Sequence, residues 1–95
     1  MDIKQTEVFS KWLQKLRDVR AKAAILVRIR RASFGNLGSI RSVGGGVSEM
    51  KIDVGQGYRA YFTIRQQTVL ILLCGGSKSS QEADIKKAQE MAGKF

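Results

Sequence analysis

The spacing of apolar residues changes from helical to strand-like along the chain, and this change restricts the fold more than any other feature. Between residues 9 and 16 apolar side chains recur every three or four positions, at Phe9, Trp12, Leu13 and Leu16. Such spacing is typical of one buried face of a helix. From residue 47 onward the repeat is two, as in a half-buried strand. Helices followed by strands predict an α+β fold with the helices packed on a sheet.

Two helices are expected in the first third of the chain. Thr6 is a suitable N-cap for the first helix, and Asp18 for a second helix over residues 19–32. In the second helix we expect the sheet side to consist of Val19, Ala23, Leu26 and Val27. Arg20, Arg28 and Arg31 then form a basic stripe on the other side. This stripe is either a nucleic-acid contact or the solvated face of an amphipathic helix.

Three strands are expected after the glycine-bearing segment 35–46, which we predict to be a loop. Residues 47–54 and 58–65 alternate between apolar and polar side chains around a turn at residues 55–57. After a turn at Gln66 and Gln67, residues 68–74 are apolar on both faces and suit a central strand. With a first strand at residues 2–5 and a last helix from Ser79 or Ser80 to about residue 92, the expected order is β-α-α-β-β-β-α.

Hairpin pairing would gather the polar strand residues on one face of the sheet. A three-residue loop at 55–57 and a two-residue turn at 66–67 would set Asp53 opposite Arg59, Lys51 opposite Tyr61, and Arg59 opposite Cys74. The helices then cover a face made of Met50, Ile52, Ala60, Phe62, Ile64, Val69, Ile71 and Leu73. The opposite face is the candidate active surface, with Glu49, Lys51, Asp53, Arg59, Tyr61, Cys74 and, beyond the strand, Lys78.

Each member of that surface also has an ordinary structural interpretation. Arg59 can simply pair with Asp53 across the strands, which is worth little when exposed. Lys51 can be plain surface charge, and Tyr61 can be a packing residue. Cys74 is expected to be a small core residue, because no histidine is available to lower the pKa of its thiol.

Charge and histidine content restrict the chemistry. The chain has 17 Lys and Arg, 8 Asp and Glu, and no histidine, so its formal net charge is +9. This charge favours a nucleic acid as partner, with an acidic protein or an anionic membrane surface as alternatives. The absence of histidine excludes Ser-His and Cys-His nucleophile pairs. One cysteine and scattered carboxylates predict no metal site, and the glycine runs match no nucleotide-binding motif, so no cofactor is expected.

Nothing in the sequence suggests a membrane or secreted protein. The longest apolar stretch, residues 69–74, is far shorter than the roughly 20 residues that cross a bilayer. Residues 1–5 are not followed by the apolar segment of a signal peptide. The single cysteine excludes an internal disulfide and suits a reducing compartment. We therefore expect a cytoplasmic protein that forms one domain over residues 1–95.

Several motifs together resemble the phage-derived, HigB-like branch of the RelE/ParE toxin superfamily. They are Phe9-x-x-Trp12-Leu13-x-x-Leu16, Glu49-Met50-Lys51-Ile52, Gly57-Tyr58-Arg59-Ala60-Tyr61-Phe62, Leu73-Cys74-Gly75-Gly76-x-Lys78 and Asp84-Ile85-x-x-Ala88. The resemblance implies a RelE-like fold, with two N-terminal helices on one face of an antiparallel sheet and a C-terminal helix. It also implies the toxin of a type II toxin–antitoxin system, monomeric alone and hetero-oligomeric with a helix-turn-helix antitoxin. Ribonuclease members of this superfamily cleave mRNA on the ribosome.

The resemblance also assigns roles to residues. Arg59, Lys51 and Lys78 correspond to the catalytic basic residues, which would stabilise the charge that develops when a ribose 2′-OH attacks the phosphodiester without a metal. The C-terminal catalytic tyrosine of some relatives has no clear counterpart, so Asp84, with Glu82 as the second choice, is the candidate general acid or base. RNA or ribosome contacts are expected from Arg20, Arg28, Arg31 and Tyr61. Two other functions stay open, namely ParE-like inhibition of DNA gyrase and plain nucleic-acid binding.

Overall fold

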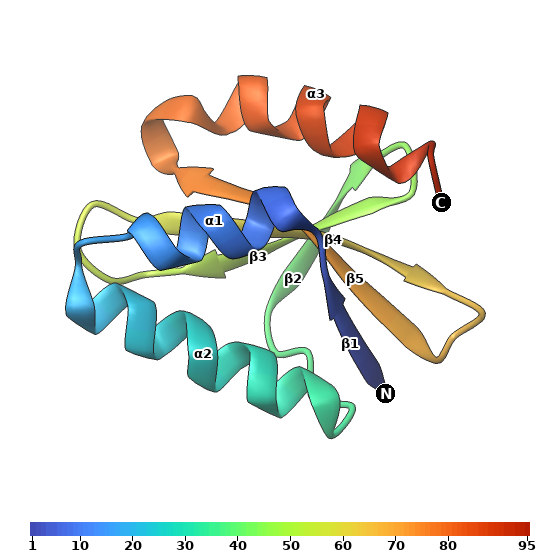
Figure 1. Ribbon diagram of the computed structural model, residues 1–95, viewed down its shortest axis with the longest axis horizontal. Coiled ribbons are helices and arrows are strands. Elements are labelled where there is room, and N and C mark those ends of the chain that lie inside the picture. Colours follow the sequence, from blue (N-terminus) through green and yellow to red (C-terminus); the bar gives the residue numbers. More distant parts are fainter.

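The computed structural model describes residues 1–95 and contains a five-stranded sheet with helices on both faces (Figure 1). In chain order the elements are β1 (Asp2–Gln5), α1 (Glu7–Lys15), α2 (Val19–Ser33), β2 (Ile40–Gly44), β3 (Val47–Ile52), β4 (Tyr58–Arg65), β5 (Val69–Ser77), a 3₁₀ turn (Lys78–Ser80) and α3 (Gln81–Ala92). The strand order in the sheet is β1-β5-β4-β3-β2, with β1 parallel to β5 and the other pairs antiparallel. This architecture confirms the predicted α+β fold.

One strand was missing from the predicted order. β2 lies within the segment that was expected to be only a loop. It pairs with β3, and the register of this pairing shifts between Ser42 and Gly44. Most of its side chains are exposed. An edge strand of this kind is held by backbone hydrogen bonds and leaves no apolar alternation in the sequence, so the pattern could not indicate it.

Both predicted helix caps are present. The Thr6 hydroxyl accepts a hydrogen bond from the Phe9 amide at 3.1 Å and donates one to the Leu73 carbonyl of β5 at 2.6 Å. Asp18 Oδ1 accepts from the Ala21 amide at 3.0 Å. The caps therefore start α1 and α2 where their sequence suggests and tie α1 to the central part of the sheet.

The face of α2 that packs on the sheet differs from the prediction. The buried residues are Ala21, Ile25 and Ala32, whereas Val19, Leu26 and Val27 are exposed. Apolar residues occur on several sides of this helix, so periodicity alone did not fix which side is buried. The small side chains of Ala21 and Ala32 flank Ile25 on the side that faces the core cluster under α1 and α2.

The strand register also differs in detail. β3 and β4 pair Lys51 with Arg59 and Glu49 with Tyr61, which is two residues away from the predicted pairing. The connecting loop is longer than predicted, with Gly55 and Gly57 at φ of 60° and 81°. A shift of two residues keeps every side chain on its face. The prediction that Lys51, Arg59 and Tyr61 share one face was therefore correct although the partners were not.

The β4–β5 register explains why both faces of the sheet are apolar at β5. Arg65 pairs with Val69, one residue beyond the predicted partner, and a bulge between Tyr61 and Phe62 then brings Tyr61 opposite Cys74. As a result Leu70 and Leu72 join the core under α1 and α2, while Ile71 and Leu73 pack under α3. The prediction that Val69, Ile71 and Leu73 share a face with Phe62 was wrong.

None of the three helices is both long enough and apolar enough to cross a bilayer.

Candidate active site

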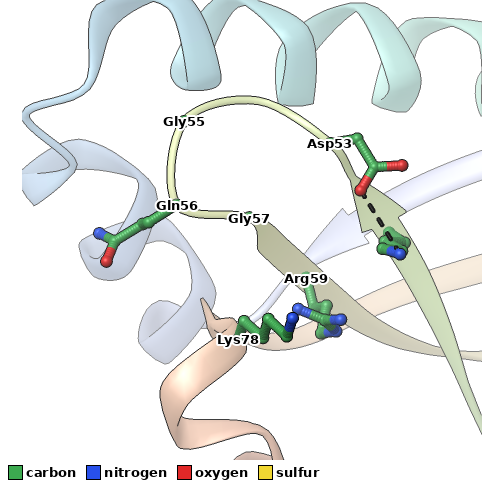
Figure 2. A pocket seen from close by; sticks show the side chains of 7 residues that line it. Asp53, Gly55, Gln56, Gly57, Arg59 and Lys78 are labelled. Atoms are coloured by element: carbon green, nitrogen blue, oxygen red, sulfur yellow. Dashed lines mark ion pairs between the residues drawn. The ribbon is translucent and has the colours of Figure 1, made fainter.

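A polar hollow of about 310 Å³ lies where β3 and β4 meet the end of β5 (Figure 2). No apolar side chain lines it, and its wall consists of Lys51, Asp53, Gly55, Gln56, Gly57, Arg59 and Lys78. We call it the catalytic hollow after the role that the sequence resemblance implies for three of its residues. The structure thus brings together Lys51, Arg59 and Lys78, the three basic residues to which the sequence resemblance assigns catalysis.

The sheet register sets the positions of these cations. Lys51 lies opposite Arg59 across β3 and β4, and Arg59 lies opposite Gly76 on β5. The chain then turns at Lys78, whose amide donates to the Gly57 carbonyl at 3.0 Å. In Figure 2 the Lys78 side chain extends toward the Arg59 guanidinium. Each cation therefore comes from a different strand or strand end.

Arg59 is a buried cation with incomplete pairing. Only 6% of it is exposed, and its Nε lies 3.7 Å from Glu49 Oε2. Its Nε and Nη1 atoms have no hydrogen-bond partner in the protein. Buried polar groups normally have partners, and an arginine fork presents its donors in a fixed geometry that matches phosphate oxygens. Arg59 is therefore suited to hold an anion at the catalytic hollow.

Glu49 is the carboxylate next to Arg59, and other side chains hold it in place. Glu49 is 4% exposed, and its carboxylate accepts hydrogen bonds from Gln81 Nε2 of α3 at 2.8 Å and from Arg41 Nη2 of β2 at 3.3 Å. The same oxygen that accepts from Gln81 is the one nearest Arg59. Glu49 therefore connects α3 and β2 to the buried guanidinium, a role that the sequence did not indicate.

A second hollow of about 420 Å³ adjoins the first. Lys51 and Arg59 line both, and the second is completed by Ser39, Arg41, Glu49 and Gln81. The two hollows form a continuous polar surface with four basic side chains, Lys51, Arg59, Lys78 and Arg41. Such a surface suits an extended polyanion better than a compact apolar ligand.

Three carboxylates have different positions, namely Asp53 and the two candidates from the sequence, Asp84 and Glu82. Asp53 lines the catalytic hollow, and its Oδ1 lies 3.5 Å from Lys51 Nζ. Asp84, the residue suggested by the sequence, does not line the hollow and accepts a hydrogen bond from the Ser80 hydroxyl at 2.6 Å. Glu82 does not line the hollow either, but it lines another pocket at the first turn of α3, which shares Lys78 with the hollow. Asp53 is thus the one carboxylate in the wall of the catalytic hollow.

Tyr61 and Cys74 lie beneath α3, away from the surface. Tyr61 is fully buried, and its hydroxyl has no hydrogen-bond partner in the protein. Burial, followed by the nearby carboxylates of Glu49 and Asp84, raises the pKa of the Tyr61 phenol above its usual value. Burial and Asp84 raise the pKa of the Cys74 thiol to about 11. Both groups stay protonated at neutral pH, and Tyr61 offers no surface to RNA.

The three arginines of the predicted basic stripe on α2 differ in their surroundings. Arg28 donates to the backbone carbonyls of Lys51, Leu37 and Ser39 at 2.8, 3.2 and 3.1 Å. It therefore fixes the loop before β2 against β3. Arg20 and Arg31 are exposed on α2, which packs on the face of the sheet opposite α3 and the catalytic hollow. The structure does not bring Arg20 or Arg31 to that hollow.

No group of three or more Cys, Asp or Glu side chains is arranged to hold a metal ion.

Comparisons with known proteins agree with this architecture. The sequence pattern of a family described as phage-derived protein Gp49-like matches residues 11–92. An uncharacterized protein of Haemophilus influenzae is 51% identical over 92 residues, which cover 97% of this chain and 93% of that protein. Among solved structures, a double-mutant form of the E. coli toxin RelE in the free state superposes with a TM-score of 0.69 at 14% identity, covering 98% of this chain and 94% of that one.

Proposed function

Because the chain belongs to the phage-derived Gp49-like family and has the fold of the toxin RelE, we propose that it is the toxin of a type II toxin–antitoxin system. We propose further that it is an endoribonuclease that cleaves mRNA on the ribosome. The observation that supports this activity is the catalytic hollow, where Lys51, Lys78 and the buried, partly unpaired Arg59 converge. Fixed donors of this kind stabilise the charge of a phosphodiester transition state.

In the proposed reaction the ribose 2′-oxygen attacks the adjacent phosphorus. A new P–O2′ bond forms and the P–O5′ bond breaks, which leaves a 2′,3′-cyclic phosphate and a 5′-hydroxyl. Arg59 and Lys51 bind the non-bridging oxygens, on which negative charge develops. Asp53 accepts the proton of the 2′-OH, and the Lys78 ammonium donates a proton to the departing 5′-oxygen. Each role falls on a residue in the wall of the catalytic hollow.

The partners follow from the same proposal. The ribosome aligns the mRNA strand, a contribution that reaches many orders of magnitude in effective molarity for well-oriented reactants. A helix-turn-helix antitoxin neutralises the toxin, which acts in the cytoplasm as a single domain formed by residues 1–95. Asp53 replaces Asp84 as the proposed proton acceptor because of its position in the wall of the hollow.

The experiment that tests this function is primer extension on a defined mRNA in a translating extract. We expect codon-linked cuts with the wild type and a loss of roughly 100-fold or more in cleavage rate for Lys51→Ala, Lys78→Ala and Arg59→Gln. The matched control is Lys86→Ala, which removes an exposed lysine of α3 outside both hollows. Circular dichroism confirms that each variant is folded.

Intact mRNA in the presence of folded wild type would contradict the proposal. The two other functions are then separated by direct assays. Poisoning of DNA gyrase without RNA cleavage would indicate a ParE-like inhibitor, and binding without either effect would indicate a nucleic-acid-binding module.

A further inference from the structure

An unpartnered apolar surface runs along the outer side of α2. Val19 is 77% exposed, Leu26 49%, Val27 48%, and Phe34, at the C-terminal cap, 80%. Together with Arg30 they occupy positions 19, 26, 27, 30 and 34. Successive spacings of seven, one, three and four residues place them on one side of the helix. We call this set the outer α2 face. In Figure 1 α2 is an outermost element, with the sheet and α1 on its inner side.

The outer α2 face is not an extension of the hydrophobic core. The core under α1 and α2 takes Ala21, Ile25 and Ala32 from the opposite side of the helix and includes none of the outer residues. The chain exposes eight large apolar side chains, and four of them are on this helix or its cap. Concentration of exposed apolar side chains in one patch, unlike scattered ones, marks an interaction surface.

The charged residues within α2 all have one sign. α2 contains five basic residues and no acidic residue. Arg28 is engaged with backbone carbonyls, but Arg20, Lys22, Arg30 and Arg31 form no ion pair in the structure. Arg30 lies within the apolar side chains, so any surface that covers them must also meet a cation.

We propose that the outer α2 face is the docking surface for a partner protein, which presents an amphipathic helix with acidic residues beside its apolar side chains. Apolar packing of such a helix covers Leu26, Val27 and Phe34, while its carboxylates pair with the arginines. The inference does not depend on the proposed ribonuclease activity, because the sheet separates this face from the catalytic hollow.

Three other occupants fit less well. A second copy of this chain would set like charges of the two α2 helices against each other. A lipid bilayer that covered the apolar side chains would also take the Arg30 guanidinium into its apolar region, where no counter-charge is available. A nucleic acid would pair with the arginines through its phosphates and leave the apolar side chains uncovered. A partner carboxylate next to apolar groups satisfies both parts of the surface.

The test is selection from a displayed library of amphipathic helical peptides. The peptides have the 15-residue length of α2 and randomised acidic, basic and neutral residues beside a fixed apolar stripe. Selection uses the wild-type protein, and counter-selection with the folded variant Leu26→Gln removes peptides that bind elsewhere, including on the basic catalytic hollow. Fluorescence anisotropy then measures the affinity of each selected peptide.

We expect the surviving peptides to be enriched in acidic residues and to bind about tenfold more weakly to Arg30→Gln, a variant that the selection does not use. Val8→Gln on α1 and Lys86→Gln on α3 are matched controls, since they remove one exposed apolar side chain and one exposed cation from other helices. Both controls should retain wild-type affinity.

Other results would overturn the proposal. One is the absence of surviving peptides, and another is a surviving set without acidic enrichment. Sedimentation that shows a dimer of the wild type, abolished by Leu26→Gln, would assign the face to a second copy. Binding to vesicles of anionic lipid that is lost in Leu26→Gln would assign it to a membrane, and loss of RNA binding in this variant would assign it to nucleic acid.

Discussion

At the scale of single residues, the burial of Arg59 explains why the catalytic hollow is preorganised. A buried cation is costly unless it is paired, and Arg59 has one carboxylate neighbour, Glu49, at 3.7 Å. Glu49 is itself fixed by hydrogen bonds from Gln81 and Arg41. The guanidinium therefore cannot turn away to solvent as an exposed arginine does. The guanidinium lines the catalytic hollow, and its Nε and Nη1 atoms have no hydrogen-bond partner in the protein.

The first prediction concerns the proton acceptor. Asp53→Asn removes the carboxylate in the wall of the catalytic hollow while keeping the size of the side chain. We expect cleavage of mRNA to slow by about 100-fold or more, in the range typical of a lost general base. The measurement is the single-turnover cleavage rate in the translating extract, with substrate affinity determined in parallel.

Asp84→Asn is the matched control for this prediction. Asp84 accepts a hydrogen bond from Ser80 and does not line the hollow, so its substitution should leave the cleavage rate within a few-fold of wild type. A large loss in Asp84→Asn together with full activity in Asp53→Asn would return the role to Asp84, as the sequence suggested.

The sequence predicted that Lys51 and Arg59 lie on one face but not what surrounds them. Lys51 and Arg59 share a face because strand alternation has a period of two, which survives an error of two residues in register. The position of Asp53 depends on the length of the 53–57 loop, which alternation does not define. The burial of Tyr61 depends on where α3 lies over the sheet, and no local pattern contains that information.

At the scale of elements, two consecutive glycines of β5 allow helices to approach the sheet from both sides. A Cβ atom on Gly75 would collide with the ring of Trp12 on α1. A Cβ atom on Gly76 would collide with the Asp84 carboxylate on α3 and with Ser80. The glycine pair in the Leu73–Lys78 motif is therefore a packing requirement that also sets where Lys78 leaves the sheet.

The second prediction follows from this packing. Gly75→Ala forces the Trp12 ring or β5 to move, and we expect a loss of about 2 kcal/mol in the free energy of unfolding. Chemical denaturation monitored by tryptophan fluorescence measures it, since the ring itself is displaced. Gly93→Ala at the end of α3 is the control, because its Cβ would make only ordinary contacts. Equal stability of Gly75→Ala and wild type would show that the close approach is not required.

The third prediction concerns the link between α2 and β3. Arg28→Gln removes charge-assisted hydrogen bonds to the carbonyls of Lys51, Leu37 and Ser39, so we expect a loss of about 2 kcal/mol in the free energy of unfolding. Arg31→Gln, an exposed position of the same helix with no ion pair, should change it little. Equal losses of stability in Arg28→Gln and Arg31→Gln would mean that Arg28 acts only through the net charge. Hydrogen exchange at residues 36–40 reports whether the loop has loosened.

The elements themselves were predictable to different degrees. α1 was predicted because Phe9, Trp12 and Leu13 recur at helical spacing and a cap residue precedes them. α2 was predicted as a helix, but its apolar residues lie on two sides, and only one of these meets the sheet. This excess of apolar surface is the feature that periodicity could not resolve, and it is also what exposes the outer α2 face.

At the scale of the whole molecule, the sheet divides the positive charge between two sides. Lys51, Arg59 and Lys78 meet in the catalytic hollow, while Arg20 and Arg31 are exposed on α2 across the sheet. A net charge of +9 attracts RNA to the molecule from any direction, but only short-range contacts fix where the strand binds. The two sides therefore make separate contributions that salt dependence can distinguish.

The fourth prediction uses that separation. For single-stranded RNA, each phosphate contact lowers the logarithm of the binding constant by about 0.7 for each tenfold increase in salt concentration. Three cations in the catalytic hollow therefore predict a slope of roughly −2 in a plot of the logarithm of the binding constant against the logarithm of salt concentration. Lys51→Gln combined with Lys78→Gln should reduce the slope to about one third. Arg20→Gln combined with Arg31→Gln should leave it unchanged, although both double variants lose the same net charge. The measurement is anisotropy with a 2′-O-methylated oligonucleotide, which cannot be cleaved by 2′-OH attack. A shallower slope for the α2 variant alone would place the RNA on α2 and contradict both the proposed site and the proposed protein partner of that helix.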